Sequence, residues 1–256
     1  MLLCKNSMPL AEIMNKEPYV LDETDDFAVI FKPPKMHSVP LSKKSGDTLL
    51  EWYTSIFPPV IGLMHRLDFE THGLALAAKN LKAYEFLKAA QDRDEFIKEY
   101  SAVCSGFADE SSIPASGFPP PPFSTNEFST EKPLVIESYF RPFGPGRKQV
   151  RPVIEDGKKH RELAKDRGGF YRTEITEVRK NAFTLRIKRG FRHQIRCHLC
   201  WIGFPILNDP VYRFPLNEET VPDDEPAAGI LALRAHALFF TDPSSGKPRE
   251  YRITSC

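Results

Sequence analysis

The chain has 256 residues, of which 41% are hydrophobic and 27% are charged, and its formal net charge is +1. This length suffices for a substantial core, and the composition is ordinary for a soluble globular protein. No apolar run approaches the roughly 18 residues of a membrane span, and the first apolar run is too short for a signal peptide. The five cysteines lack the spacing that is typical of a disulfide framework, which favours a reducing compartment. We therefore expect a cytoplasmic protein that does not bind a membrane.

Positive charge is concentrated in one segment, although the whole chain is nearly neutral. Residues 178–208 contain seven Lys and Arg residues and no Asp or Glu, whereas acidic residues gather at 21–27 and 217–225. A near-neutral protein with one basic region can bind a polyanion locally. On charge alone, a solvated basic surface without a partner is an equal alternative.

Short strands and helices alternate along the first part of the chain. Residues 27–31 predict a strand that ends at "KPP", where proline removes the backbone donors. Thr48 and Glu51 have the spacing of a capping box and predict a helix that ends near "FPP". Residues 81–92 have the periodicity of an amphipathic helix.

The second part of the chain continues this alternation. A strand follows the predicted helix, with Lys98, Tyr100 and Ala102 on one face. Residues 107–133 are too rich in proline and serine for regular structure and predict an insertion. Residues 171–190 predict a hairpin, and the helix after it ends near Gly203. This mixture favours an α+β fold over a doubly wound one.

Asp68 follows Arg66 in "MHRLDFETHG", beside an apolar stretch. An ionised carboxylate in such a place is costly unless it is paired, so Asp68 is either a structural partner of Arg66 or Arg192 or a functional residue. The chain contains no phosphate-binding loop, no dinucleotide fingerprint and no nucleophile elbow. A carboxylate, a strand tyrosine and several arginines remain, and they require no cofactor.

Four potential zinc ligands lie close together in the sequence: His193, Cys197, His198 and Cys200. They crowd one short helix beside two arginines and lack a second cysteine pair. Buried thiols and hydrogen-bonded imidazoles are therefore favoured over a metal site.

Five stretches resemble, in order, the motifs of the RluA-type pseudouridine synthases. The central stretch is "HRLDFETHGLALAAK", and the other four are "VIFKPPKMHSVP", "KEYSAVCSG", "RGFRHQIRCHLCWIGFPILND" and "LALRAHALFFTDPSSGKP". The resemblance implies the pseudouridine synthase fold, a mixed and largely antiparallel central sheet flanked by helices and loops. It also implies one catalytic domain over residues 22–256. The extension at residues 1–21 is too short for the RNA-binding S4 domain that some relatives carry.

The resemblance implies an enzyme that isomerises uridine to pseudouridine in ribosomal or transfer RNA, as a monomer and without metal or cofactor. Asp68 matches the catalytic aspartate, and Tyr100 matches the tyrosine that packs on the uracil and assists proton removal from carbon 5. The implied catalytic residues are Asp68, Tyr100 and Arg192. The implied substrate-binding residues are Arg66, Thr71, Gly73, Lys98, His193, Gln194 and Arg196. An inactive RNA-binding module of the same fold and a uridine glycosylase are the alternatives.

The sequence departs from the motifs at four positions: His72 replaces a serine, Phe191 an arginine, Asn208 a glycine and Arg234 a histidine. The change at 191 leaves Arg192 and Arg196 as candidates for the guanidinium beside Asp68. On a helix these two would lie about one turn apart. Arg196 matches a second arginine of the family motif, the one in "HQIR". Arg192 is therefore the preferred partner of Asp68.

Overall fold

The computed structural model describes residues 17–41, 46–57, 60–106, 117–122, 133–154, 170–213 and 229–253. The chain divides into two compact units. The first comprises Met1–Glu99, Pro226–Ile230 and Arg234–Cys256, and the second comprises Tyr100–Glu225 and Leu231–Leu233. The single catalytic domain predicted over residues 22–256 stays a prediction.

Two predicted segments lie mostly outside the described residues. Residues 1–16 of the expected N-terminal extension are not described, and strand β1 (Tyr19–Glu23) begins before the boundary expected at residue 21. Of the proline- and serine-rich insertion expected at 107–133, the structure describes 117–122 and 133.

The first unit is built on a mixed sheet. Its strands are β1 (Tyr19–Glu23), β2 (Phe27–Lys32), β3 (Gly62–Leu63), β4 (His72–Ala78), β10 (Leu233–Thr241) and β11 (Pro248–Arg252). Strand β2 pairs antiparallel with β1 and β4, and β3 also pairs antiparallel with β4. Strand β10 pairs parallel with β4 and antiparallel with β11. The two parallel neighbours β4 and β10 are far apart in the sequence, which local pattern cannot predict.

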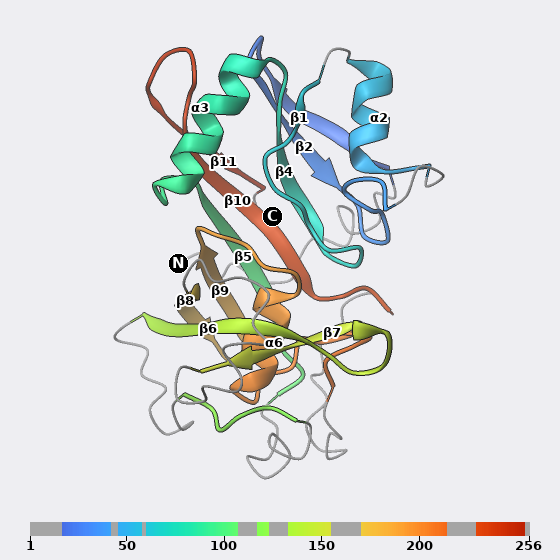
Figure 1. Cartoon of the computed structure of the whole chain (residues 1–256), viewed down its shortest axis with the longest axis vertical. Helices are drawn as coiled ribbons and strands as arrows, with labels where there is room; N and C mark the ends of the chain where they lie inside the picture. Colours follow the sequence, from blue (N-terminus) through green and yellow to red (C-terminus); the bar gives the residue numbers. More distant parts are fainter. Residues whose placement is uncertain are drawn as a thin grey trace, which may run out of the picture. The chain divides into compact units, whose positions relative to one another are not determined.

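Both faces of this sheet are buried, which explains the unbroken apolar run of β2. Alternate residues of β2, beginning with Phe27, pack in one cluster with Leu87 of helix α3 (Leu81–Asp92). The intervening residues, Ala28 and Ile30, pack with Leu49 and Tyr53 of helix α2 (Leu49–Ile56). Figure 1 shows α2 and α3 beside these strands.

The helix predictions for this unit are confirmed. Thr48 accepts from the Glu51 backbone while Glu51 bonds back to the Thr48 backbone, so the capping box begins α2 as expected. Helix α3 has the bounds predicted from its periodicity, and the Asn80 side chain caps its first turn.

The second unit is built on antiparallel strands. Its strands are β6 (Leu134–Phe143), β7 (Gln149–Val153), β8 (Tyr171–Arg179) and β9 (Ala182–Ile187). Strand β6 pairs with β7 and β8, and β8 pairs with β9 in the predicted hairpin. A short 3-10 turn (Pro145–Arg147) links β6 to β7, and β5 (Ile97–Val103) carries the chain from the first unit into the second. Among the described residues, most of the strand pairs are antiparallel, β4 and β10 are parallel, and helices are few, which confirms the predicted α+β class.

Helix α6 (Gln194–Trp201) is buried along its whole length. Its His198 ring contacts Ser138 of β6 through Nε2 (3.0 Å) and Thr173 of β8 through Nδ1 (2.8 Å). Strand β9 alternates as predicted, with Phe183, Leu185 and Ile187 buried. Among the described residues, no helix has the length and apolarity that a membrane crossing requires.

Gly73 is required where β4 meets β10. Its φ is +120°, and an added Cβ would lie 2.2 Å from the Ala235 carbonyl oxygen. We predict that Gly73→Ala lowers the free energy of unfolding by about 2–4 kcal/mol, because backbone strain and overpacking act together. Gly62→Ala is the matched control, since nothing lies within 4 Å of its added Cβ. Equal denaturation midpoints for the two variants would contradict this reading.

Candidate active site

Asp68 lies in the loop between β3 and β4, and side-chain and backbone bonds fix the loop on both sides of it. The Ser38 hydroxyl donates to the Leu67 carbonyl (2.8 Å) and accepts from the Leu67 N–H (3.0 Å). The Asp68 carbonyl accepts from the Thr71 N–H (3.1 Å), which closes a turn. The position of the Asp68 backbone is therefore determined by the surrounding protein.

Lys32 holds the loop on the other side of Asp68. Its buried ammonium donates to the carbonyls of Pro33 (2.9 Å), Met36 (2.8 Å) and Phe69 (3.4 Å). Burial lowers the pKa of Lys32 to about 7, against an opposing effect of the Asp68 and Glu70 carboxylates. Asp68 thus interacts electrostatically with Lys32, a cation that the sequence patterns do not assign to the site. The only local signal was the lysine before "PP".

His65, the first residue of the central motif, has a structural role in this unit. Its Nε2 accepts from the Leu76 N–H (3.3 Å), and its ring packs edge-on to Phe96. Burial lowers its pKa to about 3, so the imidazole is neutral at pH 7 and can accept this bond. The Gln91 side chain donates to the Met64 carbonyl (2.6 Å). These contacts attach the start of the Asp68 loop to β4 and α3.

The other predicted site residues of the first unit differ in exposure. Arg66 is exposed, whereas Thr71 and Lys98 are buried. Burial lowers the pKa of Lys98 to about 8, and its ammonium lies 4.8 Å from the centre of the Phe96 ring. Gly73 belongs to β4, where its role in strand pairing is clear.

Two departures from the family motifs are neighbours in the first unit. His72 of β4 and Arg234 of β10 are in register across the parallel pair, and both are buried. Burial lowers the pKa of His72 to about 3, and the positive charges of Arg234 and Lys32 act in the same direction. His72 is therefore neutral at physiological pH.

In the second unit, Arg196 forms a buried ion pair. Its Nε and Nη2 each lie 2.7 Å from a carboxylate oxygen of Asp209, and both side chains are at most 2% exposed. Asp209 also accepts from the N–H groups of Val211 and Tyr212. Arg196 thus anchors the loop after α6 through a bidentate contact.

The same loop supports the start of α6. The Tyr212 hydroxyl accepts from the Val150 N–H (2.9 Å) and lies 3.2 Å from Nδ1 of His193. His193 is the N-cap residue and has a left-handed backbone, with φ of 58°. The Gln194 carboxamide accepts from the Phe191 N–H and donates to Arg172 and Thr173. These contacts fix the backbone turn that leads into α6.

Arg192 and Arg196 do not lie on one helix. Helix α6 begins at Gln194, and the left-handed residue His193 separates Arg192 from it. Arg192 is exposed, and its Nη2 donates to the carbonyls of Arg147 (2.6 Å) and Gln149 (3.2 Å). The site residues Asp68, Arg66, Thr71, Gly73 and Lys98 belong to the first unit. Tyr100, Arg192, His193, Gln194 and Arg196 belong to the second. The pairing of Asp68 with Arg192 stays a prediction.

The four potential zinc ligands, His193, Cys197, His198 and Cys200, do not form a metal site among the described residues. Cys197 and Cys200 are buried, which raises the pKa of each thiol, and Cys197 lies 3.4 Å from the Val150 carbonyl. The described part of the chain contains no group of three or more His, Cys, Asp and Glu side chains that could hold a metal ion.

Most of the predicted basic segment is exposed. Six of its seven cations are on the surface: Arg179, Lys180, Arg186, Lys188, Arg189 and Arg192. Arg196 is the buried exception. Burial of Arg196 follows from its position inside α6, whereas Arg192 lies in the turn before this helix and the others lie on or next to β8 and β9.

The profile of one family, described as RNA pseudouridylate synthase, matches residues 26–201. This chain belongs to that family. It is an RluA-type member, and it is similar to the proteins named ribosomal large subunit pseudouridine synthase D. The Haemophilus ducreyi protein is 26% identical over 198 residues, which are 75% of this chain and 52% of that protein. The Vibrio parahaemolyticus protein is 27% identical over 242 residues, 91% of this chain and 65% of that protein.

The chain spans about half the length of the first of these family relatives. Solved structures of the family support the fold. Human RNA pseudouridylate synthase domain containing 1 has a TM-score of 0.62 at 19% identity, covering 93% of this chain and 84% of that one. Human RNA pseudouridylate synthase domain containing 4 has a TM-score of 0.56 at 18% identity, covering 93% and 88%.

The lowered pKa of Lys32 predicts a pH-dependent stability. Between about pH 7 and the usual lysine pKa of 10.5, the unfolded chain binds the Lys32 proton and the folded chain does not. The free energy of unfolding should therefore rise with pH across this window, and Lys32→Met should lose that part of the rise. Urea titrations at several pH values measure it, with the exposed Lys82→Met as the control. Parallel pH curves for wild type and Lys32→Met would exclude the shift.

Proposed function

We propose that this chain isomerises uridine in RNA to pseudouridine, with Asp68 as the catalytic carboxylate. The observation that carries the proposal is the fixed backbone around Asp68, where Ser38 and Lys32 bond to the residues on either side. A catalytic group has to be held in place before the substrate arrives, because its geometry sets the rate. Membership of the family supports the same assignment.

The proposed reaction needs no co-reactant. The bond between N1 of the uracil and C1′ of the ribose breaks, the base turns, and a bond forms between C5 and C1′. A proton leaves C5 and one is gained at N1, so substrate and product are isomers. Asp68 assists cleavage and rejoining as a nucleophile, and the Tyr100 hydroxyl assists removal of the C5 proton. We assign Arg192 as the guanidinium that supports the carboxylate.

We propose ribosomal RNA as the substrate, with transfer RNA as the alternative. The relatives from Haemophilus ducreyi and Vibrio parahaemolyticus carry ribosomal large subunit in their names. The exposed cations of residues 179–192 support binding to a phosphate backbone. The target uridine has to leave its stack to be reached, which such contacts assist. A cytoplasmic monomer without metal or cofactor remains our expectation.

Two other functions are distinguished by their products. An inactive RNA-binding module would bind the same RNA without changing it. A uridine glycosylase would release free uracil, whereas an isomerase keeps the base in the RNA. Chromatography of the reaction mixture therefore separates the three possibilities.

Asp68→Asn should abolish turnover while the fold survives, because the side chain keeps its size and loses its nucleophilic charge. Tritium release from RNA that carries uridine labelled at carbon 5 measures turnover, and thermal unfolding checks the fold. The matched control is Glu70→Gln, which removes a carboxylate from the same loop and should retain most activity. Unchanged tritium release by Asp68→Asn would refute the assignment of Asp68.

A further inference from the structure

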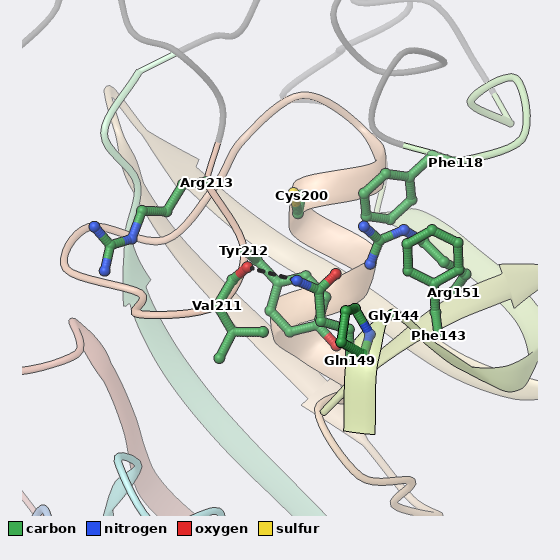
Figure 2. Close-up of a pocket in the computed structure, with 10 residues that line it drawn as sticks. Phe118, Phe143, Gly144, Gln149, Arg151, Cys200, Val211, Tyr212 and Arg213 are labelled. Carbon is green, nitrogen blue, oxygen red and sulfur yellow. Dashed lines mark hydrogen bonds between the residues drawn. The ribbon is translucent and has the colours of Figure 1, made fainter. Parts of the chain in front are cut away.

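A cavity of about 280 Å³ in the second unit has a structural explanation. It lies beside the turn between β6 and β7 and the loop at 211–213 (Figure 2). Figure 2 shows the Arg151 guanidinium between two phenylalanine rings, and its Nη1 donates to the Val150 carbonyl (3.0 Å). The Gln149 side chain donates to the Val211 carbonyl (3.3 Å). Because these donors already bond to backbone carbonyls, we assign the cavity no ligand.

An exposed aromatic side chain follows Asp68 directly in the first unit. Phe69 is 39% exposed, and its ring centre lies 4.6 Å from that of His37, with 39° between the ring planes. His37 is half-buried. It supports one side of the Phe69 ring and leaves much of the rest accessible. A single exposed apolar residue is ordinary on a protein surface, so exposure alone indicates no ligand.

The backbones that carry these two rings are tied together. The buried Lys32 ammonium donates to the Phe69 carbonyl (3.4 Å) and to the carbonyl of Met36, the residue before His37 (2.8 Å). The His37 carbonyl also accepts from the N–H of Leu49, the first residue of α2 (2.9 Å). The rings therefore project from fixed backbones, and a flat ligand that packs on them would cost little ordering of the protein.

Exposed cations precede both rings in the sequence. Arg66 lies three residues before Phe69, and Lys35 lies two residues before His37. Glu70 has the opposite charge, which acts on the buried lysine of this loop. Exposed cations favour a ligand that carries phosphates, and an exposed ring favours one that carries flat bases. Single-stranded nucleic acid satisfies both conditions.

We propose that Phe69, supported by His37, stacks on the base of the nucleotide next to the reacting uridine. When a uridine leaves its stack, the neighbouring base loses a flat partner, and an aromatic side chain can replace it. The reacting uracil is itself assigned to Tyr100. Consecutive Cα atoms are about 3.8 Å apart, so the Phe69 ring is close enough to Asp68 to meet an adjacent nucleotide. The proposal rests on the proposed function, since it takes RNA as the ligand and Asp68 as the reacting carboxylate.

A fluorescent base tests this contact without turnover. The probe is a single-stranded RNA octamer with 2-aminopurine at its fourth position and uridine elsewhere, because 2-aminopurine loses fluorescence when it stacks on a ring. We expect wild-type protein to bind the octamer and quench its fluorescence. Phe69→Leu keeps an apolar side chain but loses the flat face, so binding should weaken about tenfold and the quenching should disappear. Phe69→Tyr keeps the ring and should retain both. Since Phe69 is exposed, both variants should fold, which thermal unfolding checks.

The matched control is Phe170→Leu, at an aromatic residue of the second unit that is also 39% exposed. It should bind and quench like wild type. Unchanged affinity and quenching in Phe69→Leu would overturn the proposal, as would an equal loss in the two leucine variants or no quenching by wild type. Failure of the proposed function is separate: wild-type protein would then release no tritium from labelled RNA, yet could still quench the octamer through Phe69.

Discussion

The first unit depends on one constraint, the attachment of the Asp68 loop to the segment between Lys32 and Ser38. Ser38 satisfies both backbone groups of Leu67, and Lys32 donates to the Phe69 carbonyl, so the residues flanking Asp68 are held by side chains. Both anchors are buried. A buried lysine is costly, and three carbonyl oxygens together with the nearby carboxylates offset that cost. The pairing of the short strand β3 with β4 and the ring of His65 then hold the rest of the loop.

The second unit uses a buried ion pair for a similar purpose. Arg196 and Asp209 are almost fully shielded from water, and the remaining carboxylate bonds go to the backbone of the 209–213 loop. Removing one partner of such a pair usually costs about 3–5 kcal/mol, because the other charge is left buried. Through Tyr212 the loop supports His193 and Val150. Arg196 therefore has a structural role here, and low activity of any Arg196 variant must be compared with its stability before it is taken as catalytic.

Much of the fold could be predicted because it depends on local pattern. The capping box at Thr48, helix α3 and the β8–β9 hairpin follow from periodicity and turn chemistry within a few residues. The anchors of Asp68 could not be predicted in this way, since Ser38 and Leu67 are 29 positions apart and the contact exists only after folding. The separation of Arg192 from α6 could not be predicted for a different reason: His193 adopts a left-handed backbone, which non-glycine residues rarely do. The family motifs predict Asp68 and Tyr100 as site residues, but they do not predict that Lys32 interacts with the Asp68 carboxylate.

We propose that the fixed backbone around Asp68 makes its carboxylate effective in the isomerisation. Ser38→Ala removes both bonds to Leu67 and leaves Asp68 and its charge in place. Single-turnover rates of tritium release with saturating RNA should fall by about tenfold to a hundredfold, because small misplacement of a catalytic group is costly. RNA affinity should remain near that of wild type. Ser55→Ala, at an exposed serine of α2 that donates to the Trp52 carbonyl of the same helix, should keep the wild-type rate. A folded Ser38→Ala protein with an unchanged single-turnover rate would contradict the account.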